Sequence, residues 1–310
     1  MLSLIMVKTT LSHSRWSQAL ILGACGLISY SAAIAGPTAK NPGPIAPVEA
    51  VDWKANTISP VANPMFFEDP VIRTEIRPIF AYHRIDDGFV TNGGHATLYV
   101  VQIRYAITDR LAFIATQDGY FSINTGLGVD WEGWMDLAAG FKYALIDDQA
   151  NQFILTPGFT YSIPMGSNEV FQGNGDGDLD LFVSAEKGFG DLHVMANAGF
   201  RIPLDDSFST MFHYSAMVDY YVCQWFIPFV VANGWTVVSE GSTIGLDSEG
   251  YDVINFGSSA AGGTTQMTVG GGFRTRLTAN MDFGVAYEKA ILSPEGLTDD
   301  RVTVDLSIRF

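Results

Sequence analysis

The sequence predicts an all-β protein: a closed antiparallel transmembrane β-barrel of about 12 strands, connected as an up-and-down meander. Three observations carry this prediction. Apolar and polar side chains alternate with a period of two residues along most of residues 70–310. Short turns alternate with longer links between these runs, and the last run ends at the carboxyl terminus in Phe310.

The composition excludes several other classes of protein. The chain has 310 residues, of which 47% are hydrophobic and 16% charged, whereas soluble domains average about 25% charged residues. The net charge of −16, from 17 basic and 33 acidic residues, excludes nucleic-acid binding through a basic face. No stretch after residue 35 runs for about 18 apolar residues without a charge or turn, which excludes membrane-spanning helices. The apolar content is too high for a disordered chain.

Residues 1–35 have the pattern of a secretory signal peptide. Lys8 and Arg15 give it a positively charged N-terminal region, and residues 19–28 form its apolar core. Ala33-Ile34-Ala35 fits the small-residue pattern of a cleavage site. Cleavage there would make Gly36 the first residue of the mature chain. We therefore expect export through the inner membrane to the bacterial outer membrane.

Two alternatives stay open for this region. An uncleaved anchor is disfavoured because the apolar run is short and ends in small residues. Leu22-Gly23-Ala24-Cys25 resembles a lipoprotein box, but the apolar run continues beyond Cys25. Cleavage would leave Cys223 as the one cysteine, so that no intramolecular disulfide could form. That is ordinary for an outer-membrane barrel and unusual for a secreted sandwich.

Residues 36–69 form a proline-rich segment with little periodicity. Its prolines are Pro37, Pro42, Pro44, Pro47, Pro60 and Pro64. Such a composition favours extended chain over a regular element. We expect either a periplasmic tail or a segment inside the barrel lumen.

The expected strands follow one another to the carboxyl terminus. In the last strand the two faces are Val302, Val304, Leu306, Ile308 and Phe310 against Thr303, Asp305, Ser307 and Arg309. The full set covers residues 72–84, 95–107, 111–120, 134–145, 151–163, 178–187, 191–202, 209–222, 225–237, 264–277, 280–291 and 301–310. The count carries an uncertainty of two, because residues 225–237 are apolar on both faces.

The connections predict which end of the barrel faces which compartment. Short turns fall near residues 108–110, 147–150, 188–190, 223–224 and 278–279, and longer links at 85–94, 121–133, 164–177, 203–208, 238–263 and 292–300. Outer-membrane barrels have short periplasmic turns and longer outer loops. An even number of strands then places both ends of the barrel chain on the periplasmic side.

A closed barrel is favoured over a sandwich because a chain in hydrocarbon must satisfy every backbone N–H and C=O internally. The apolar faces would point to lipid, and the small, polar or charged faces inward. A sandwich would bury the apolar faces together. Aromatic residues near strand ends fit the interfacial girdles of such barrels: Tyr82, Tyr99, Tyr105, Tyr143, Tyr161, Tyr220, Trp225 and Trp235.

Two groups of sequence segments resemble those of known protein families. Residues 301–310, ending in Phe310, resemble the assembly signal of Gram-negative outer-membrane barrels, which implies the barrel-assembly machinery as a partner. Tyr105-Ala-Ile-Thr-Asp-Arg-Leu111 and residues 133–143 resemble hairpins of the meta-pathway phenol-degradation family of outer-membrane transporters, and residues 177–179 echo them in part. This resemblance implies a channel or uptake role for aromatic or other hydrophobic compounds. It implies no catalytic residue.

The alternation assigns a set of charged side chains to the lumen. The candidate lumen-lining residues are Arg104, Lys142, Glu186, His193, Arg201, Asp219, Arg274, Arg276, Asp282, Glu288, Asp305 and Arg309. Mixed charges in a narrow barrel form either a selectivity constriction or a structural network of ion pairs. Arg274 and Arg276, expected to face Asp282 and Glu288 across one hairpin, are the group to test first.

Two further motifs have ordinary explanations. Residues 174–180 carry alternating carboxylates that suit Ca²⁺, but Leu179 and Ala185 occupy the positions where an EF-hand loop needs Gly and Glu. His213 and Ser215 share a strand face, which resembles the outer-membrane phospholipase. The position of that family's Asn is Ile227 here, with Asn233 the nearest candidate, so a hydrolase is the least favoured function.

We expect a passive outer-membrane channel or transporter for small solutes, with no enzyme activity, cofactor or metal. The alternative is a non-conducting barrel that acts as a structural or surface-interaction protein through acidic loops 164–177 and 238–263. The expected partners are outer-membrane lipid, lipopolysaccharide and a small-molecule solute, and not nucleic acid. The solute, the ion selectivity and the oligomeric state do not follow from the sequence.

Overall fold

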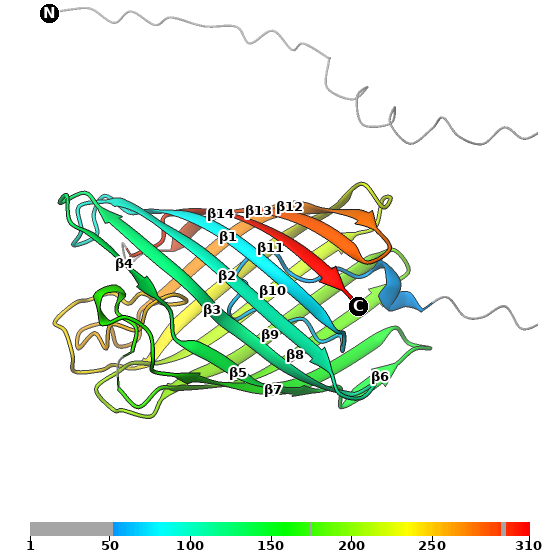
Figure 1. Ribbon diagram of the computed structural model, residues 1–310, viewed down its shortest axis with the longest axis horizontal. Coiled ribbons are helices and arrows are strands. Elements are labelled where there is room, and N and C mark those ends of the chain that lie inside the picture. The colour runs from blue at the N-terminus through cyan, green and yellow to red at the C-terminus, as the bar shows by residue number, and fades with distance from the viewer. Residues whose placement is uncertain (1–51, 174, 293–295) are drawn as a thin grey trace, which may run out of the picture. The chain divides into compact units, whose positions relative to one another are not determined.

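The computed structural model describes residues 52–173, 175–292 and 296–310. The expected signal peptide and residues 36–51 of the proline-rich segment lie outside the described residues. The described chain is one compact unit that consists almost wholly of strands (Figure 1). Within it, no helix is of the length and apolarity needed to cross a membrane.

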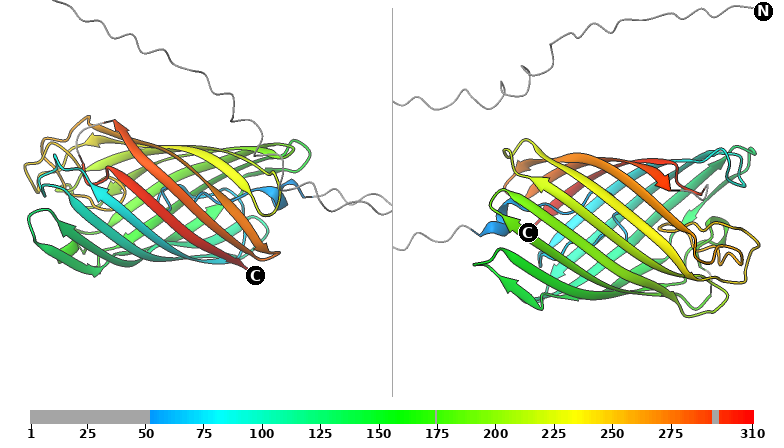
Figure 2. Two further views of the ribbon diagram at one scale, coloured as in Figure 1. Left: turned by 90° about the horizontal axis from the view of Figure 1, so that it is seen from above. Right: turned by 180° about the vertical axis from the view of Figure 1, so that it is seen from behind.

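The strands form a closed antiparallel sheet in sequence order, which confirms the predicted fold class (Figures 1 and 2). They are β1 (Glu75–Ile85), β2 (Gly94–Ala106), β3 (Leu111–Thr125), β4 (Asp130–Trp134), β5 (Leu137–Tyr143), β6 (Ile146–Asp148), β7 (Phe153–Ile163), β8 (Asp178–Phe189), β9 (Leu192–Pro203), β10 (Thr210–Tyr220), β11 (Ile227–Ser239), β12 (Thr265–Thr278), β13 (Met281–Leu292) and β14 (Asp300–Arg309).

Pairing between the first and the last strand closes the sheet. β1 pairs with β14 through eight residue pairs, including Phe80 with Val304. β4 and β5 share one position beside β3, and the short β6 extends the sheet beside β7. The strands of the described residues therefore occupy 12 positions around the barrel. The pairing of β1 with β14 removes the two edges that an open sheet would expose, as a lipid environment requires.

The connections divide the barrel into two ends (Figure 1). The turn end carries residues 107–110, 190–191, 221–226 and 279–280 together with the carboxyl terminus. The loop end carries the longer connections, of which 240–264 is the longest. One expected long link is wrong: β3 continues to Thr125, so that only residues 126–129 join it to β4. The reason is that Phe121 and Ile123 are buried on the inward face and pair with residues of β4.

The side-chain alternation follows the expected parity. In β14, Thr303, Asp305 and Ser307 are buried inside the barrel, whereas Val302 on the other face is exposed. Most of the aromatic residues expected at strand ends are exposed on the outside, among them Tyr99, Tyr105 and Trp225. Trp235 is an exception, because it is buried on the inward face of β11. There it packs against Met211, Val237, Tyr251 and Ala261.

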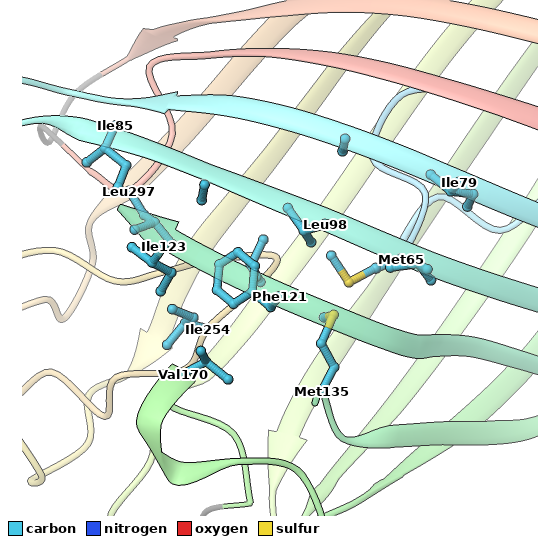
Figure 3. Close-up of a cluster of buried hydrophobic side chains, with 14 of the residues drawn as sticks. Met65, Ile79, Ile85, Leu98, Phe121, Ile123, Met135, Val170, Ile254 and Leu297 are labelled. Carbon is cyan, nitrogen blue, oxygen red and sulfur yellow. The ribbon is translucent and has the colours of Figure 1, made fainter. Parts of the chain in front are cut away.

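The inward face is less polar than the sequence predicted. Towards the loop end, the interior of β1, β2 and β3 is apolar, with Ile85, Leu98 and Phe121 pointing into the barrel (Figure 3). These side chains pack against Ile254 and Leu297 from the loop end. The loops therefore fold back into the barrel and supply the apolar partners that its strands need.

Val304 tests whether the outer face contacts hydrocarbon. It lies opposite Phe80 and Val285 near the middle of the sheet. We expect Val304→Arg to lower the free energy of unfolding in lipid vesicles by about 2–4 kcal/mol, because a cation near the bilayer midplane is poorly solvated. Denaturant titration followed by gel mobility measures this. The control Val304→Ile should change stability by less than about 0.5 kcal/mol. Equal stability of the Arg and Ile variants would contradict a lipid-facing position.

Candidate functional site

The barrel interior holds an N-terminal segment of the chain. Residues 57–71, which follow the 3-10 helix η1 (Trp53–Asn56), are all buried. We call residues 57–71 the inner segment. In Figure 1 it is the blue chain that runs behind the strands, inside the barrel. Two clusters fix it by apolar contacts: Met65 and Phe66 belong to the cluster of Figure 3, and Ile58, Val61 and Phe67 to a second one.

The prolines explain how irregular chain can lie in a closed barrel. A proline carries no N–H, so its backbone needs a partner only for the carbonyl oxygen. Inward-facing side chains provide these partners. Arg77 donates to the carbonyl of Pro60, Gln102 Nε2 to that of Pro64 at 2.7 Å, and Thr156 Oγ1 to that of Pro70 at 2.7 Å.

Glu68 is the charged anchor of the inner segment. Its carboxylate accepts two hydrogen bonds from Arg104 and one from Lys142 Nζ at 2.7 Å. Lys142 Nζ also donates to the carbonyl of Asp69 at 2.7 Å. Glu75 completes the group, with Oε1 at 2.9 Å from Arg104 Nη1. All these side chains are buried, so each charge depends on its partners rather than on water.

Asp305 joins two cations that also hold the inner segment. Arg274 forms a two-point pair with Asp305, at 2.8 and 2.7 Å, and Arg77 is bonded to the same carboxylate. Arg274 Nε donates to the carbonyl of Ser59 at 2.8 Å. The charges of β1, β12 and β14 are thus satisfied together with the backbone of the inner segment.

Asp282 forms a similar group at the turn end. It pairs with Arg309, at 2.6 Å, and with Arg276, at 3.4 Å. Arg276 Nη1 also donates to the carbonyl of Ala55 at 2.7 Å. A cavity of about 460 Å³ opens here, and its charged lining residues are Asp52, Lys54, Arg73, Arg276 and Arg309.

Glu288 joins the inner segment to the loop half of the interior, because it also accepts a hydrogen bond from Asn63 N at 3.3 Å. Its carboxylate accepts hydrogen bonds from Asn233 at 2.7 Å and Thr268 at 3.0 Å, and lies 3.7 Å from Arg301. Arg301 in turn pairs with Asp252 of the long loop at 2.6 Å. This chain of contacts connects the barrel wall to the loop that folds into its mouth.

All twelve candidate lumen-lining residues lie on the inward face, ten of them buried and Arg276 and Arg309 half-buried. The expected grouping across one hairpin is correct only for Arg276 and Asp282. Arg274 on β12 lies opposite Gly284 on β13 and pairs with Asp305 on β14, because Gly284, which has no side chain, lies between the two. Sequence reasoning missed Glu68. The segment around it lacks the alternation of apolar and polar residues that would indicate which way its side chain points.

The two minor motifs form other contacts. Asp178 pairs with Arg201, and Asp180 Oδ1 lies 2.7 Å from His213 Nε2. Asn174 lies outside the described residues. Ser215 accepts a hydrogen bond from Asn63 of the inner segment, at 3.2 Å. Within the described part of the chain no hydrogen bond joins Ser215 to His213, so the Ser–His pair of a hydrolase is not assembled.

The loop end contains an apolar pocket of about 210 Å³. Its lining residues are Phe89, Val90, Thr91, Ile123, Trp131, Phe171, Ile244, Leu246, Ile254, Phe256 and Leu297. The rings form one group: the centroid of Phe171 lies 5.2 Å from that of Phe256 and 5.8 Å from that of Trp131. Ile123, Ile254 and Leu297 are seen together in Figure 3.

Asp299 holds in place the loop that carries Leu297, one of the residues that line this pocket. Lys289 Nζ donates to its carboxylate at 2.9 Å, and Arg84 donates from β1. The hydrogen bonds from Lys289 and Arg84 hold the pKa of this carboxyl below its usual value, because they stabilise the charged form. Backbone bonds from Asp299 N to Arg84 O, at 2.8 Å, and from Ala290 N to Asp299 O, at 2.7 Å, fix the same loop.

Two solved structures of outer-membrane channels have the same fold. The NanC porin matches with a TM-score of 0.50 and 10% identity over 76% of this chain and 100% of its own. An outer membrane channel from Pseudomonas putida F1 matches with a TM-score of 0.53 and 16% identity over 82% of this chain and 100% of its own. No family model matches the sequence, and no curated protein matches it. The chain therefore has the fold of outer-membrane β-barrel channels. Neither match identifies the meta-pathway family that the sequence resembles.

Glu68 tests whether the inner segment stabilises the barrel. We expect Glu68→Gln to lower the free energy of unfolding by at least about 3 kcal/mol, because Arg104 and Lys142 lose the carboxylate that they share. The matched control is Asp147→Asn, which removes the more exposed partner of Lys54 and should cost less than about 1 kcal/mol. Denaturant unfolding in detergent measures both. Equal effects would show that the buried charges do not hold the inner segment.

Proposed function

We propose that the protein is a passive channel of the bacterial outer membrane for small hydrophobic solutes, aromatic compounds included. It carries out no chemical reaction on them. The loop end faces outward, and the turn end faces the periplasm. The fold that it shares with outer-membrane channels supports the general function. The apolar pocket at the loop end is the single observation that supports the class of solute.

The size and lining of the pocket fit a single aromatic ring. A dry apolar cavity of about 150 Å³ binds benzene, and this pocket has about 210 Å³. Among the described residues, its only polar side-chain groups are the hydroxyl of Thr91 and the indole N–H of Trp131. Binding there would remove an aromatic surface from water and place it against aromatic side chains at the distances that rings prefer.

The inner segment is the constriction between the two ends of the path. A solute that leaves the apolar pocket meets Met65 and Phe66, which belong to the same apolar cluster as Ile254 and Leu297. Beyond them lie the anchoring charges of Glu68, and then the polar cavity at the turn end. Passage requires these side chains, or the inner segment itself, to move.

The inner segment also favours a second candidate function. Because residues 57–71 fill the interior, a non-conducting structural barrel is the alternative. Planar-bilayer recording separates the two. Discrete conductance steps of the full-length protein, larger in Glu68→Gln, are the result that a channel predicts. Silence of both proteins would favour the structural barrel.

Phe256 tests the class of solute. Uptake of isotope-labelled phenol by Gram-negative cells that express the protein should fall at least about fivefold in Phe256→Asp, because a carboxylate in the pocket costs more to desolvate than a ring. Phe256→Leu keeps the pocket apolar and should retain most of the uptake. Surface expression is checked by heat-modifiable gel mobility. Unchanged phenol uptake in Phe256→Asp would contradict the role of the pocket.

A further inference from the structure

Three inward-facing groups that the solute path does not use converge near the turn end. Glu186 lies on β8, His193 on β9 and Asp219 on β10. His193 is directly opposite Asp219 across one strand pair, and opposite Gly188 across the other. One ligand atom from each of the three groups lies within 4.8 Å of the other two. All three residues are buried.

Four polar atoms of this group lack hydrogen-bond partners among the described residues. Both carboxylate oxygens of Glu186, Nε2 of His193 and Oδ2 of Asp219 are buried without a hydrogen bond in the described part of the chain. The one bond within the group joins His193 Nδ1 to Asp219 Oδ1 at 2.8 Å. Elsewhere in this interior the carboxylates of Glu68, Asp305 and Glu288 each have two or more partners. An unpartnered buried carboxylate is costly, so Glu186 indicates that a cation belongs here.

We propose that Glu186, His193 and Asp219 form a binding site for a divalent first-row transition-metal ion such as Zn²⁺. One imidazole and two carboxylates suit Zn²⁺, which takes nitrogen and oxygen ligands at about 2.0–2.2 Å. Because the three ligand atoms lie within 4.8 Å of one another, side-chain movement can bring all three to one ion. Three protein ligands leave a position for water or another small ligand, as open zinc sites do. The ion would neutralise two carboxylates and tie three neighbouring strands together.

Arg73 is the competing partner. It acts electrostatically on Glu186, and its Nε and Nη2 also have no hydrogen-bond partner within the residues that the structure describes. A rotation of either side chain could form an ion pair that needs no metal. Arg73 lies 3.6 Å from Asp69, however, which also attracts it. The metal proposal and the Arg73 pair predict different results in the same experiment.

Trp53 provides a local reporter. Its ring centroid lies 6.3 Å from that of His193. Its Cε3 atom lies 2.9 Å from the position that a Cβ atom on Gly188 would occupy, so the indole packs directly against this glycine. Paramagnetic Co²⁺ bound at the site would quench the fluorescence of this indole at close range. The difference between wild type and Trp53→Phe isolates that signal from the other tryptophans.

The test is calorimetric titration of ZnCl₂ into the folded, chelator-treated full-length protein in detergent, with CoCl₂ fluorescence as the second readout. We expect about one Zn²⁺ per chain, and a Kd at least about tenfold weaker in Glu186→Gln and His193→Gln. His213→Gln is the matched control, because it removes another buried His–Asp pair, which has no third metal-ligating group beside it in the described part of the chain. It should leave the Kd unchanged.

Two results would overturn the proposal. One is the absence of saturable Zn²⁺ binding to wild type, which leaves the Arg73 pair as the partner of Glu186. The other is equal Zn²⁺ binding by wild type, Glu186→Gln and His193→Gln, which places the ion elsewhere. Gel mobility shows that each variant is folded before it is titrated.

Discussion

The need to satisfy every backbone N–H and C=O within the chain determines the rest of this structure. In hydrocarbon a sheet meets that need only when its first and last strands pair, as β1 and β14 do here. Closure fixes one face of every strand towards lipid and the other towards the interior. The face towards lipid is therefore apolar, and the face towards the interior carries the crowded network of charges.

A closed barrel of this width creates a second problem, because inward charges have little water around them. The inner segment solves much of it. Its carbonyls accept from Arg274, Gln102 and Thr156, while Glu68 neutralises Arg104 and Lys142. Towards the loop end the partners are apolar instead, and the loops cover them. The interior thus changes from an apolar pocket at one end to a charged cavity at the other, and this gradient supports the proposed function.

The sequence predicted the outer half of this structure better than the inner half. Lipid imposes one rule on every strand, so a period of two identified the strands and the direction of each candidate side chain. Pairing inside the barrel obeys no such rule. Arg274 could not be matched to Asp305 without the register between strands, and Glu68 lies in a segment without periodicity. The prediction for Trp235 was wrong because β11 is apolar on both faces, so that the alternation does not indicate which face points inward.

The most direct test of the account is the environment of successive residues along β14 in a bilayer. A nitroxide placed singly at each position from 302 to 308, in a Cys223→Ser background, would report its collision rates with oxygen and with a water-soluble nickel complex. Oxygen, which concentrates in acyl chains, should dominate at positions 302, 304, 306 and 308, and both rates should be low at the packed positions 303, 305 and 307. Higher nickel than oxygen accessibility at 304 and 306 would contradict a lipid-facing outer surface and, with it, the closed membrane barrel.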